Sequence, residues 1–244
     1  MSTDIAELCD LADHNALDAA HHFARHDAGA AVAERDGTLL VASSAPISTL
    51  FHSSARRVDP KADPEDVLAA TAEFAREHRR ELNLWLSALA DADLVQAVQT
   101  AGLDYRSTLA GMAIRESTAA GSLAAGVDLV RVTDTAGAGD FARVHGELFA
   151  AAGRPAEAAE HFASPGALLT GNVAGFVAYL GGRPVSCAMV VHTGRAAGLF
   201  GVATSSDARK RGLGESVSRA AVRAGFELGA EVVVLQATAL GEPV

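Results

Sequence analysis

The chain has 244 residues, of which 49% are hydrophobic and 20% charged, a composition that suits a folded protein with a buried core and argues against disorder. Its formal charge of -10 argues against a general nucleic-acid binder. The N-terminus lacks the features of a signal peptide, no apolar run approaches about 20 residues, and Cys9 and Cys187 form no disulfide framework. We therefore expect a cytoplasmic protein with neither a nucleic-acid nor a membrane partner.

The first half alternates helical and strand patterns. Apolar residues at helical spacing predict the first helix, and Arg35-Asp36-Gly37 is typical of a hairpin turn. Asp63-Pro64 begins a second helix, and Gly102 ends a third. The predicted elements are a helix over 4–26, a hairpin within 29–45, a helix from 63, a strand over 82–88, a helix over 91–103 and a strand over 105–114.

The second half repeats a similar order after a run of small residues, 116–126, that we interpret as a linker. Its predicted elements are a strand from 127, helices near 139–152 and 155–163, a hairpin over 176–192 turning at Gly181-Gly182, a strand over 196–204, a helix over 214–228 and a strand over 231–238. We therefore expect an α/β (α+β layered) fold with two units, 1–115 and 127–244, each with a mixed, mostly antiparallel sheet flanked by helices.

Positive charge and glycine concentrate where the helix over 214–228 begins. Arg209, Lys210 and Arg211 run into Gly212 and Gly214 directly after a strand. A helix N-terminus offers unpaired backbone N–H groups and a partial positive charge, and glycines let a ligand approach the backbone. The pattern predicts a phosphate or pyrophosphate cradle.

Other phosphate-binding motifs fit less well. The GxxxxGK[ST] loop is absent, and Val217 stands where a dinucleotide fingerprint needs its third glycine. A weaker GxGxxA at Gly137, Gly139 and Ala142 lacks the following acidic strand end, and Asp140 is more simply interpreted as a helix N-cap.

The loop from Arg209 to Gly214 resembles the [QR]-x-x-G-x-[GA] loop of the GNAT acyl-CoA N-acyltransferases. The order of elements over 127–244 also resembles that family, and the first half resembles a degenerate unit of a tandem member. The corresponding region of the first half, residues 53–67, has no Gly-x-Gly, so no cofactor is expected there.

The resemblance implies an N-acetyltransferase in which an amine attacks acetyl-CoA directly. Backbone N–H groups of the loop would hold the pyrophosphate, Arg209 would help to neutralise it, and the end of the preceding strand would bind the pantetheine arm. The implied cofactor-binding residues are Val202, Ala203, Thr204, Arg209, Lys210, Arg211, Gly212, Leu213, Gly214 and Glu215. The amine, on a small molecule or a peptide, would enter where the strands over 196–204 and 231–238 part.

The sequence departs from the family after residue 238. The family's short helix, with a Tyr that protonates the leaving thiolate, and its closing strands have no counterpart. We therefore expect either a truncated C-terminal unit with an unpaired sheet edge or a partner that supplies the missing layer. Neither Tyr105 nor Tyr179 takes the place of that Tyr. His192 is a weak candidate base; an ordinary strand-end residue is the simpler interpretation. Gln236 and Thr238 lie on the strand beside the expected opening.

Three functions therefore stay open: an N-acetyltransferase, a non-catalytic acyl-CoA binder or pseudo-enzyme, and an interaction module. A homodimer is possible. His22 and His26 share a helix face, but the pattern around them favours a solvated surface, and no metal site is expected. Asp91 and Asp93 are interpreted as helix caps, and Trp85 as a core residue.

Overall fold

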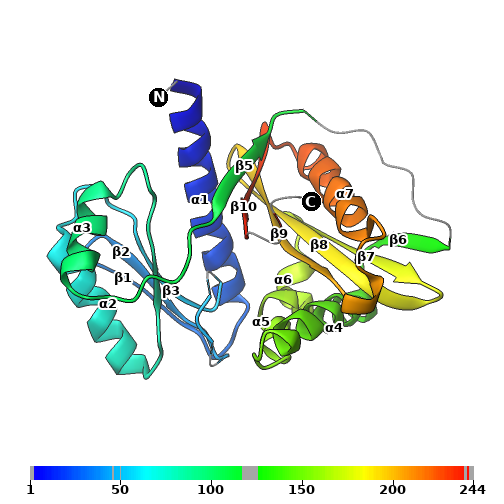
Figure 1. Cartoon of the computed structure of the whole chain (residues 1–244), viewed down its shortest axis with the longest axis horizontal. Coiled ribbons are helices and arrows are strands. Elements are labelled where there is room, and N and C mark those ends of the chain that lie inside the picture. The colour runs from blue at the N-terminus through cyan, green and yellow to red at the C-terminus, as the bar shows by residue number, and fades with distance from the viewer. Residues whose placement is uncertain (1–2, 46, 50, 117–125, 239–240, 242–244) are drawn as a thin grey trace. The chain divides into compact units, whose positions relative to one another are not determined.

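The computed structural model describes residues 3–45, 47–49, 51–116, 126–238 and 241 (Figure 1). The chain divides into two compact units: residues 1–9 and 20–108 form the first, and residues 10–19 and 109–244 form the second. The expected mixed α/β architecture, with two sheets flanked by helices, is confirmed. Of the predicted linker 116–126, residues 117–125 lie outside the described residues.

The first unit contains a four-stranded sheet in the order β1-β2-β3-β4. Strands β1 to β3 are antiparallel neighbours, and β4 pairs parallel with β3. The strands are β1 (Ala31–Arg35), β2 (Thr38–Ala42), β3 (Ser53–Arg57) and β4 (Asn83–Trp85), and the helices are α2 (Pro64–His78) and α3 (Ala92–Thr100). The predicted hairpin is confirmed: Asp36 and Gly37 between β1 and β2 both have positive φ, as a tight hairpin turn requires.

Strand β3 has no counterpart among the predicted elements, because its sequence SSARR has no apolar alternation. It is nevertheless buried, since it lies between β2 and β4 in the sheet. Its last residue, Arg57, has a side chain only 2% exposed and donates hydrogen bonds to Asp91 and Asp93 at 2.9 Å.

The predicted side-chain cap by Asp91 is wrong, whereas Asp93 lies in the first turn of α3 with its carboxylate bound by Arg57. Asp91 occupies the N-cap position of α3, but its side chain makes no cap hydrogen bond. Instead it accepts from Arg57 Nε and from the backbone N–H of Ser87. A buried guanidinium needs paired carboxylates more than the start of α3 needs a cap.

The second unit contains a six-stranded sheet in the order β5-β10-β9-β8-β7-β6. The β9–β10 pair is parallel and the other pairs are antiparallel. The strands are β5 (Ala110–Ile114), β6 (Val127–Arg131), β7 (Val173–Leu180), β8 (Arg183–Thr193), β9 (Ala196–Thr204) and β10 (Val232–Ala237). The helices are α4 (Thr135–Ala151), α5 (Ala158–Ala163), α6 (Pro165–Leu168) and α7 (Leu213–Glu227), with a 3-10 turn η1 (Ser206–Ala208).

Strand β5 corrects one expectation. The sequence pattern assigns residues 105–114 to the first unit and leaves the strand over 231–238 with an unpaired edge. In the structure β5 pairs with β10 over five residues, from Ile114 opposite Val233 to Ala110 opposite Ala237 (Figure 1). A strand that precedes residue 115 in the chain therefore lies at the edge of the second sheet.

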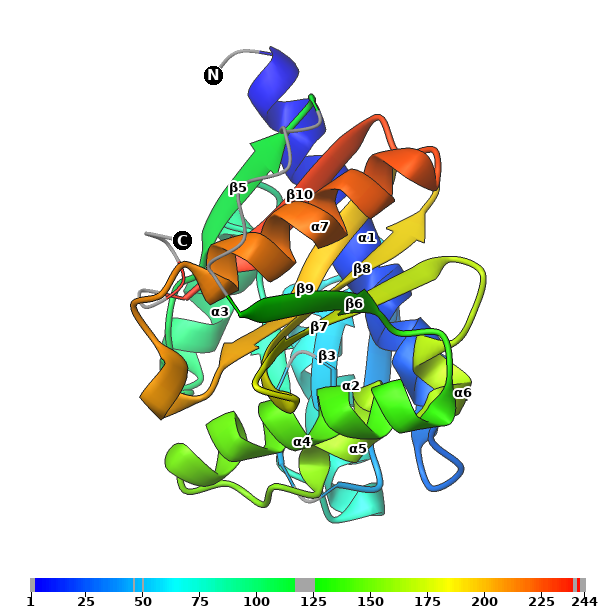
Figure 2. The same ribbon diagram turned by 90° about the vertical axis from the view of Figure 1, so that its right-hand side faces the viewer.

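Helices cover both faces of this sheet (Figure 2). The buried face of α7, with Val217, Ala220 and Ala221, packs on alternate residues of β8 and β9, such as Val190 and Ala197. The opposite face carries α4, where Phe141 lies close to Met189 and Gly201. No helix among the described residues is long and apolar enough to cross a membrane.

Helix α1 (Thr3–Arg25) contributes its segment Asp10–Ala19 to the second unit. Asn15 in this segment is 1% exposed, and its side-chain nitrogen donates to the carbonyl of Val191 at 3.0 Å and to Oγ1 of Thr193 at 2.8 Å. The side-chain nitrogen of Gln236 on β10 donates to the carbonyl of Ala12 at 3.4 Å. The segment is thereby hydrogen-bonded both to the end of β8 and to β10.

Replacing Arg57 should destabilise the first unit strongly. The Arg57→Met variant leaves the Asp91 carboxylate buried without its cation, so we expect a loss of about 3–5 kcal/mol in the free energy of unfolding. Urea unfolding measures this loss. The matched control is Arg106→Met, which breaks the exposed Arg106–Glu81 pair and should cost at most about 1 kcal/mol; equal losses in the two variants would contradict the assignment.

The cluster of Arg57, Asp91 and Asp93 should also affect how the stability of the protein changes at low pH. The hydrogen bonds from Arg57 lower the pKa of Asp93 to about 2 from its ordinary 3.8. A carboxylate with a lowered pKa stabilises the fold above its unfolded value and loses this effect as the pH falls through the folded one. We expect wild type to lose stability between about pH 4 and pH 2 more steeply than Asp93→Asn, as followed by urea midpoints; parallel pH profiles would contradict this.

Candidate functional site

The two parallel strands of the second sheet, β9 and β10, are paired over only part of their length. Strands β9 and β10 pair only from Ala196 opposite Val232 to Gly198 opposite Val234. Beyond Gly198, β9 continues to Thr204 on the β8 side, and β10 continues to Ala237 on the β5 side. The edges of β9 and β10 that face each other there make no ladder, so their backbone N–H and C=O groups are not paired with each other. We call this unpaired stretch between the two strands the V-shaped opening.

A β-bulge lies in the half of β9 that does not pair with β10. Cys187 is opposite Ala203 and Met189 is opposite Phe200, so β9 has one more residue than β8 in this interval. Gly201 within it has φ of +62°, and a Cβ there would come within 3.1 Å of the Phe141 ring. Glycine thus permits the bulge, which bends β9 at the V-shaped opening.

The predicted cradle lies between two buried anchors. Ala208, at the end of η1, and Leu213, the first residue of α7, are 1% and 2% exposed and pack in the core beneath α7. The residues between them, 209–212, are all exposed. The core therefore fixes the ends of this loop and leaves its backbone open to a ligand.

The backbone of the loop is shaped for an anion. Lys210 has φ of +61° and Gly212 has φ of +72°, so left-handed residues interrupt the path into α7. Such alternation turns successive N–H groups into one concave surface. No side-chain hydrogen bond caps α7 at Gly212, which leaves the first N–H groups of the helix for a ligand. Lysine in this conformation is strained, a cost that points to function.

The acidic residues beside the cradle are paired with arginines that the sequence pattern does not identify. Asp207, two residues before Arg209, would oppose a phosphate, but Arg183 Nη2 pairs with its carboxylate at 2.6 Å. Arg209 Nε donates to the carbonyl of Thr204 at 3.2 Å, and Glu215 pairs with Arg219 at 2.8 Å. Both acidic residues next to the loop are thus paired with arginines.

The three strand residues implied in pantetheine binding lie at the end of β9. Ala203 and Thr204 pair with Cys187 and Ser186 of β8, and Ser186 Oγ also donates to the carbonyl of Ala203 at 2.9 Å. Val202, in the bulge, is 37% exposed. The structure thus brings Val202, Ala203 and Thr204 together with the cradle in one stretch from strand to helix.

The structure does not bring His192 to this stretch. His192 is opposite Ala197, at the closed end of the β9–β10 pair, and seven residues, or roughly 23 Å, separate Ala197 from Thr204. Its backbone N–H donates to the carbonyl of Asn172, and its ring lies near Gly229 at the end of α7. The ordinary strand-end interpretation fits these contacts better than a role as base.

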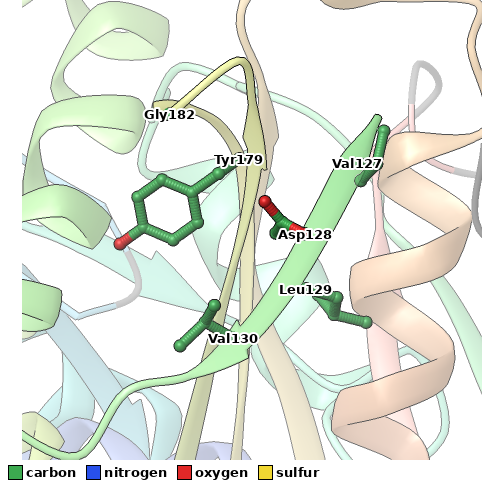
Figure 3. Close-up of a pocket in the computed structure, with 6 residues that line it drawn as sticks. All are labelled: Val127, Asp128, Leu129, Val130, Tyr179 and Gly182. Atoms are coloured by element: carbon green, nitrogen blue, oxygen red, sulfur yellow. The ribbon is translucent and has the colours of Figure 1, made fainter. Parts of the chain in front are cut away.

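Tyr179 lies elsewhere, in the lining of a shallow depression along β6 and β7 (Figure 3). Tyr179 donates its hydroxyl to Asp140 Oδ2 at 2.7 Å, and burial, together with this carboxylate, raises the pKa of Tyr179 to about 12. The N-cap interpretation of Asp140 is wrong: Asp134 caps α4 by accepting from Gly137 N–H. Strand β8 separates this depression from β9, so Tyr179 does not reach the V-shaped opening.

Part of the chain matches a known protein family. Residues 139–242 match the model of the "Acetyltransferase (GNAT) family". A search of curated proteins gives no match.

Two solved structures resemble most of the chain. A GCN5-related N-acetyltransferase from Kribbella flavida has a TM-score of 0.66 and 18% identity, and the match covers 91% of this chain and 85% of that one. A tandem GNAT protein from the clavulanic acid biosynthesis pathway has a TM-score of 0.54 and 15% identity, over 91% and 86% of the two chains. At these identities the likeness shows the fold alone.

The strain at Lys210 should be measurable. Lys210→Gly removes the cost of a left-handed backbone, so we expect the free energy of unfolding to rise by about 1 kcal/mol. Urea unfolding tests this against Arg211→Gly, a neighbouring exposed cation that lacks a positive φ. A stabilisation of the same size in both variants would show that charge, not backbone conformation, is responsible.

Proposed function

We propose that this chain transfers the acetyl group of acetyl-CoA to an amine, because residues 139–242 match the model of the GNAT acetyltransferase family. The single observation that supports this most directly is that three features follow one another along the chain. They are the half of β9 that does not pair with β10, the exposed loop 209–212 with its positive φ angles, and the uncapped start of α7. One continuous stretch of chain could thus bind an elongated ligand that ends in a pyrophosphate.

In this proposal the backbone N–H groups from Lys210 to Glu215 hold the pyrophosphate, with help from the positive end of α7. Arg209, Lys210 and Arg211 supply full positive charges at the same place. Bound acetyl-CoA would supply the acyl group as a thioester. An N–H group of β9 near the bulge would donate to the thioester carbonyl, where negative charge develops.

The chain itself would act mainly by positioning. The V-shaped opening would align the amine and the acyl group, and such alignment alone accounts for a large part of many rate enhancements. Among the described residues, His192 lies at the closed end of the strands and Tyr179 is bound to Asp140. We therefore propose that water, not either of these side chains, takes up the amine proton.

The same observation favours a second candidate, a protein that binds acyl-CoA without transferring its acyl group. Both candidates need the cradle, and they differ in whether free CoA is released when an amine is present.

A matched pair of variants tests the cradle. A side chain at Gly212 would meet no atom within 4 Å, and both Asp and Asn tolerate a left-handed backbone. Gly212→Asp adds a carboxylate where the pyrophosphate would bind, so we expect the Kd for acetyl-CoA to rise at least about tenfold, or about 1.4 kcal/mol.

Isothermal titration of acetyl-CoA measures both variants. Gly212→Asn has the same shape without the charge and should bind nearly as well as wild type. Equal affinities for wild type and Gly212→Asp would place the pyrophosphate elsewhere, and a folded wild-type chain that fails to bind acetyl-CoA would refute the proposed function.

A further inference from the structure

Two amide side chains flank the point where β9 and β10 part. The inference drawn from them rests on the proposed function and concerns the acceptor. Asn15 comes from α1 and Gln236 from β10, and both belong to the second unit. The sequence indicates only that Gln236 lies on the strand beside the opening; Asn15 is a polar residue in a stripe of small apolar residues at helical spacing, with no signal of a site.

Gln236 lies on the open half of β10. It is two residues beyond Val234, the last residue that pairs with β9, and it still pairs with Gly111 of β5. Val233 and Leu235 pack in the core beneath α7, so the alternation along a strand turns Gln236 to the opposite face. Extension of the parallel register would place Gln236 level with Phe200 of β9.

The orientation of the Gln236 amide is set by α1. Its side-chain nitrogen donates to the carbonyl of Ala12, and a backbone carbonyl can only accept. The side-chain oxygen of Gln236 is therefore the end left to serve as an acceptor. Gln236 is half-buried, so part of the residue is accessible to solvent.

The orientation of the Asn15 amide is likewise set by its hydrogen bonds. Its nitrogen is surrounded by acceptors: the carbonyls of Val191 and Ala196, at 3.0 and 3.4 Å, and Oγ1 of Thr193 at 2.8 Å. Its side-chain oxygen is buried and has no hydrogen-bond partner among the described residues. A buried acceptor without a partner is rare in native proteins and points to a missing ligand or water.

The oxygen of Asn15 lies at the apex of the V-shaped opening. A Cβ on Gly198 would clash with this oxygen and with Cζ of Phe200. Gly198 is the residue of β9 at which the pairing with β10 ends. The amide oxygen and the aromatic ring therefore occupy the same face of the sheet directly over the point where the strands part.

We propose that Asn15 and Gln236 are acceptor-binding residues: their side-chain oxygens accept hydrogen bonds from the N–H groups of the attacking amine. Both oxygens are uncharged acceptors, which suits a neutral amine whose lone pair must stay free to attack. Apolar groups lie beside both amides: Ala12, whose carbonyl accepts from Gln236, and Phe200, whose ring lies over Gly198. The acceptor is therefore a primary amine carried on an apolar carbon skeleton.

These contacts hold the amine and take no proton from it. As the nitrogen forms its bond to the acyl carbon, the carbon–sulfur bond breaks and the electron pair leaves with sulfur. One amine proton passes to water, and the thiolate takes a proton from water. The hydrogen bonds to Asn15 and Gln236 strengthen as the nitrogen becomes positive, so they favour the transition state over the free amine.

The experiment follows the side-chain amide resonances of Asn15 and Gln236 by NMR in the full chain saturated with CoA. n-Butylamine is the apolar probe, and glucosamine is a polar primary amine for comparison. We expect both resonances to shift saturably with n-butylamine, at a concentration at least tenfold lower than with glucosamine. Resonances that do not move with n-butylamine, or that respond equally to both amines, would overturn the proposal.

Variants separate amine binding from folding and from acetyl-CoA binding. In Gln236→Leu, the Asn15 resonance should need at least tenfold more n-butylamine, whereas the Kd for acetyl-CoA should stay within twofold of wild type. Gln236→Glu keeps an acceptor oxygen and should lose less. The matched control is Gln99→Leu, on the exposed surface of α3.

Failure of the proposed function and failure of the acceptor assignment would give different results. A wild-type chain that does not bind acetyl-CoA refutes the proposed function. A chain that binds acetyl-CoA normally, but whose amine affinity is unchanged by Gln236→Leu, overturns the assignment of the acceptor residues alone.

Discussion

The geometry of the second unit depends on where a single hydrogen-bonded ladder ends. Three residue pairs join β9 to β10, and the ladder stops at Gly198 and Val234. Had the pairing continued, the backbone groups of Phe200 to Thr204 would be satisfied within the sheet and no ligand could use them. The bulge at Gly201 and the second partner of β10, strand β5, keep the two strands apart while each stays part of the sheet.

The second unit is built from three pieces of chain that the sequence separates widely. The region that matches the GNAT family supplies most of the sheet, residues 110–114 supply its edge strand, and residues 10–19 supply a helical segment over β10 and the end of β8. The side chain of Asn15 also joins distant parts of the chain, because its three hydrogen-bond acceptors all lie more than 170 residues away in sequence. The early part of the chain thus contributes directly to the unit with the candidate site.

Local patterns predicted the local structure well. Strand 196–204 was predicted with the bounds of β9, the turn at Gly181-Gly182 lies between β7 and β8, and the loop from Arg209 to Gly214 leads into α7 as expected. These features depend on neighbours within a few residues, so the sequence carries the whole signal. The sequence does not predict the positive φ of Lys210, because lysine rarely adopts this conformation.

Features that depend on distant partners were missed or wrongly interpreted. The strand near 110 was expected, yet nothing in its sequence identifies β10 as its neighbour. Asp91 has the residue type and position of a helix cap, but the buried Arg57, which is 34 residues away, binds it instead. Strand β3 is buried in spite of its polar sequence, because burial follows from its place between β2 and β4.

The pairing of β5 with β10 also bears on the order in which the protein can fold. During synthesis β5 leaves the ribosome about 120 residues before its partner, so it must wait, with an unpaired edge, while the rest of the second unit is made. Closing so long a loop is slow compared with the formation of the neighbouring hairpins. The edge strand of the second sheet is thus the first part of that sheet to be made, and we expect its pairing with β10 to be among the last steps of folding.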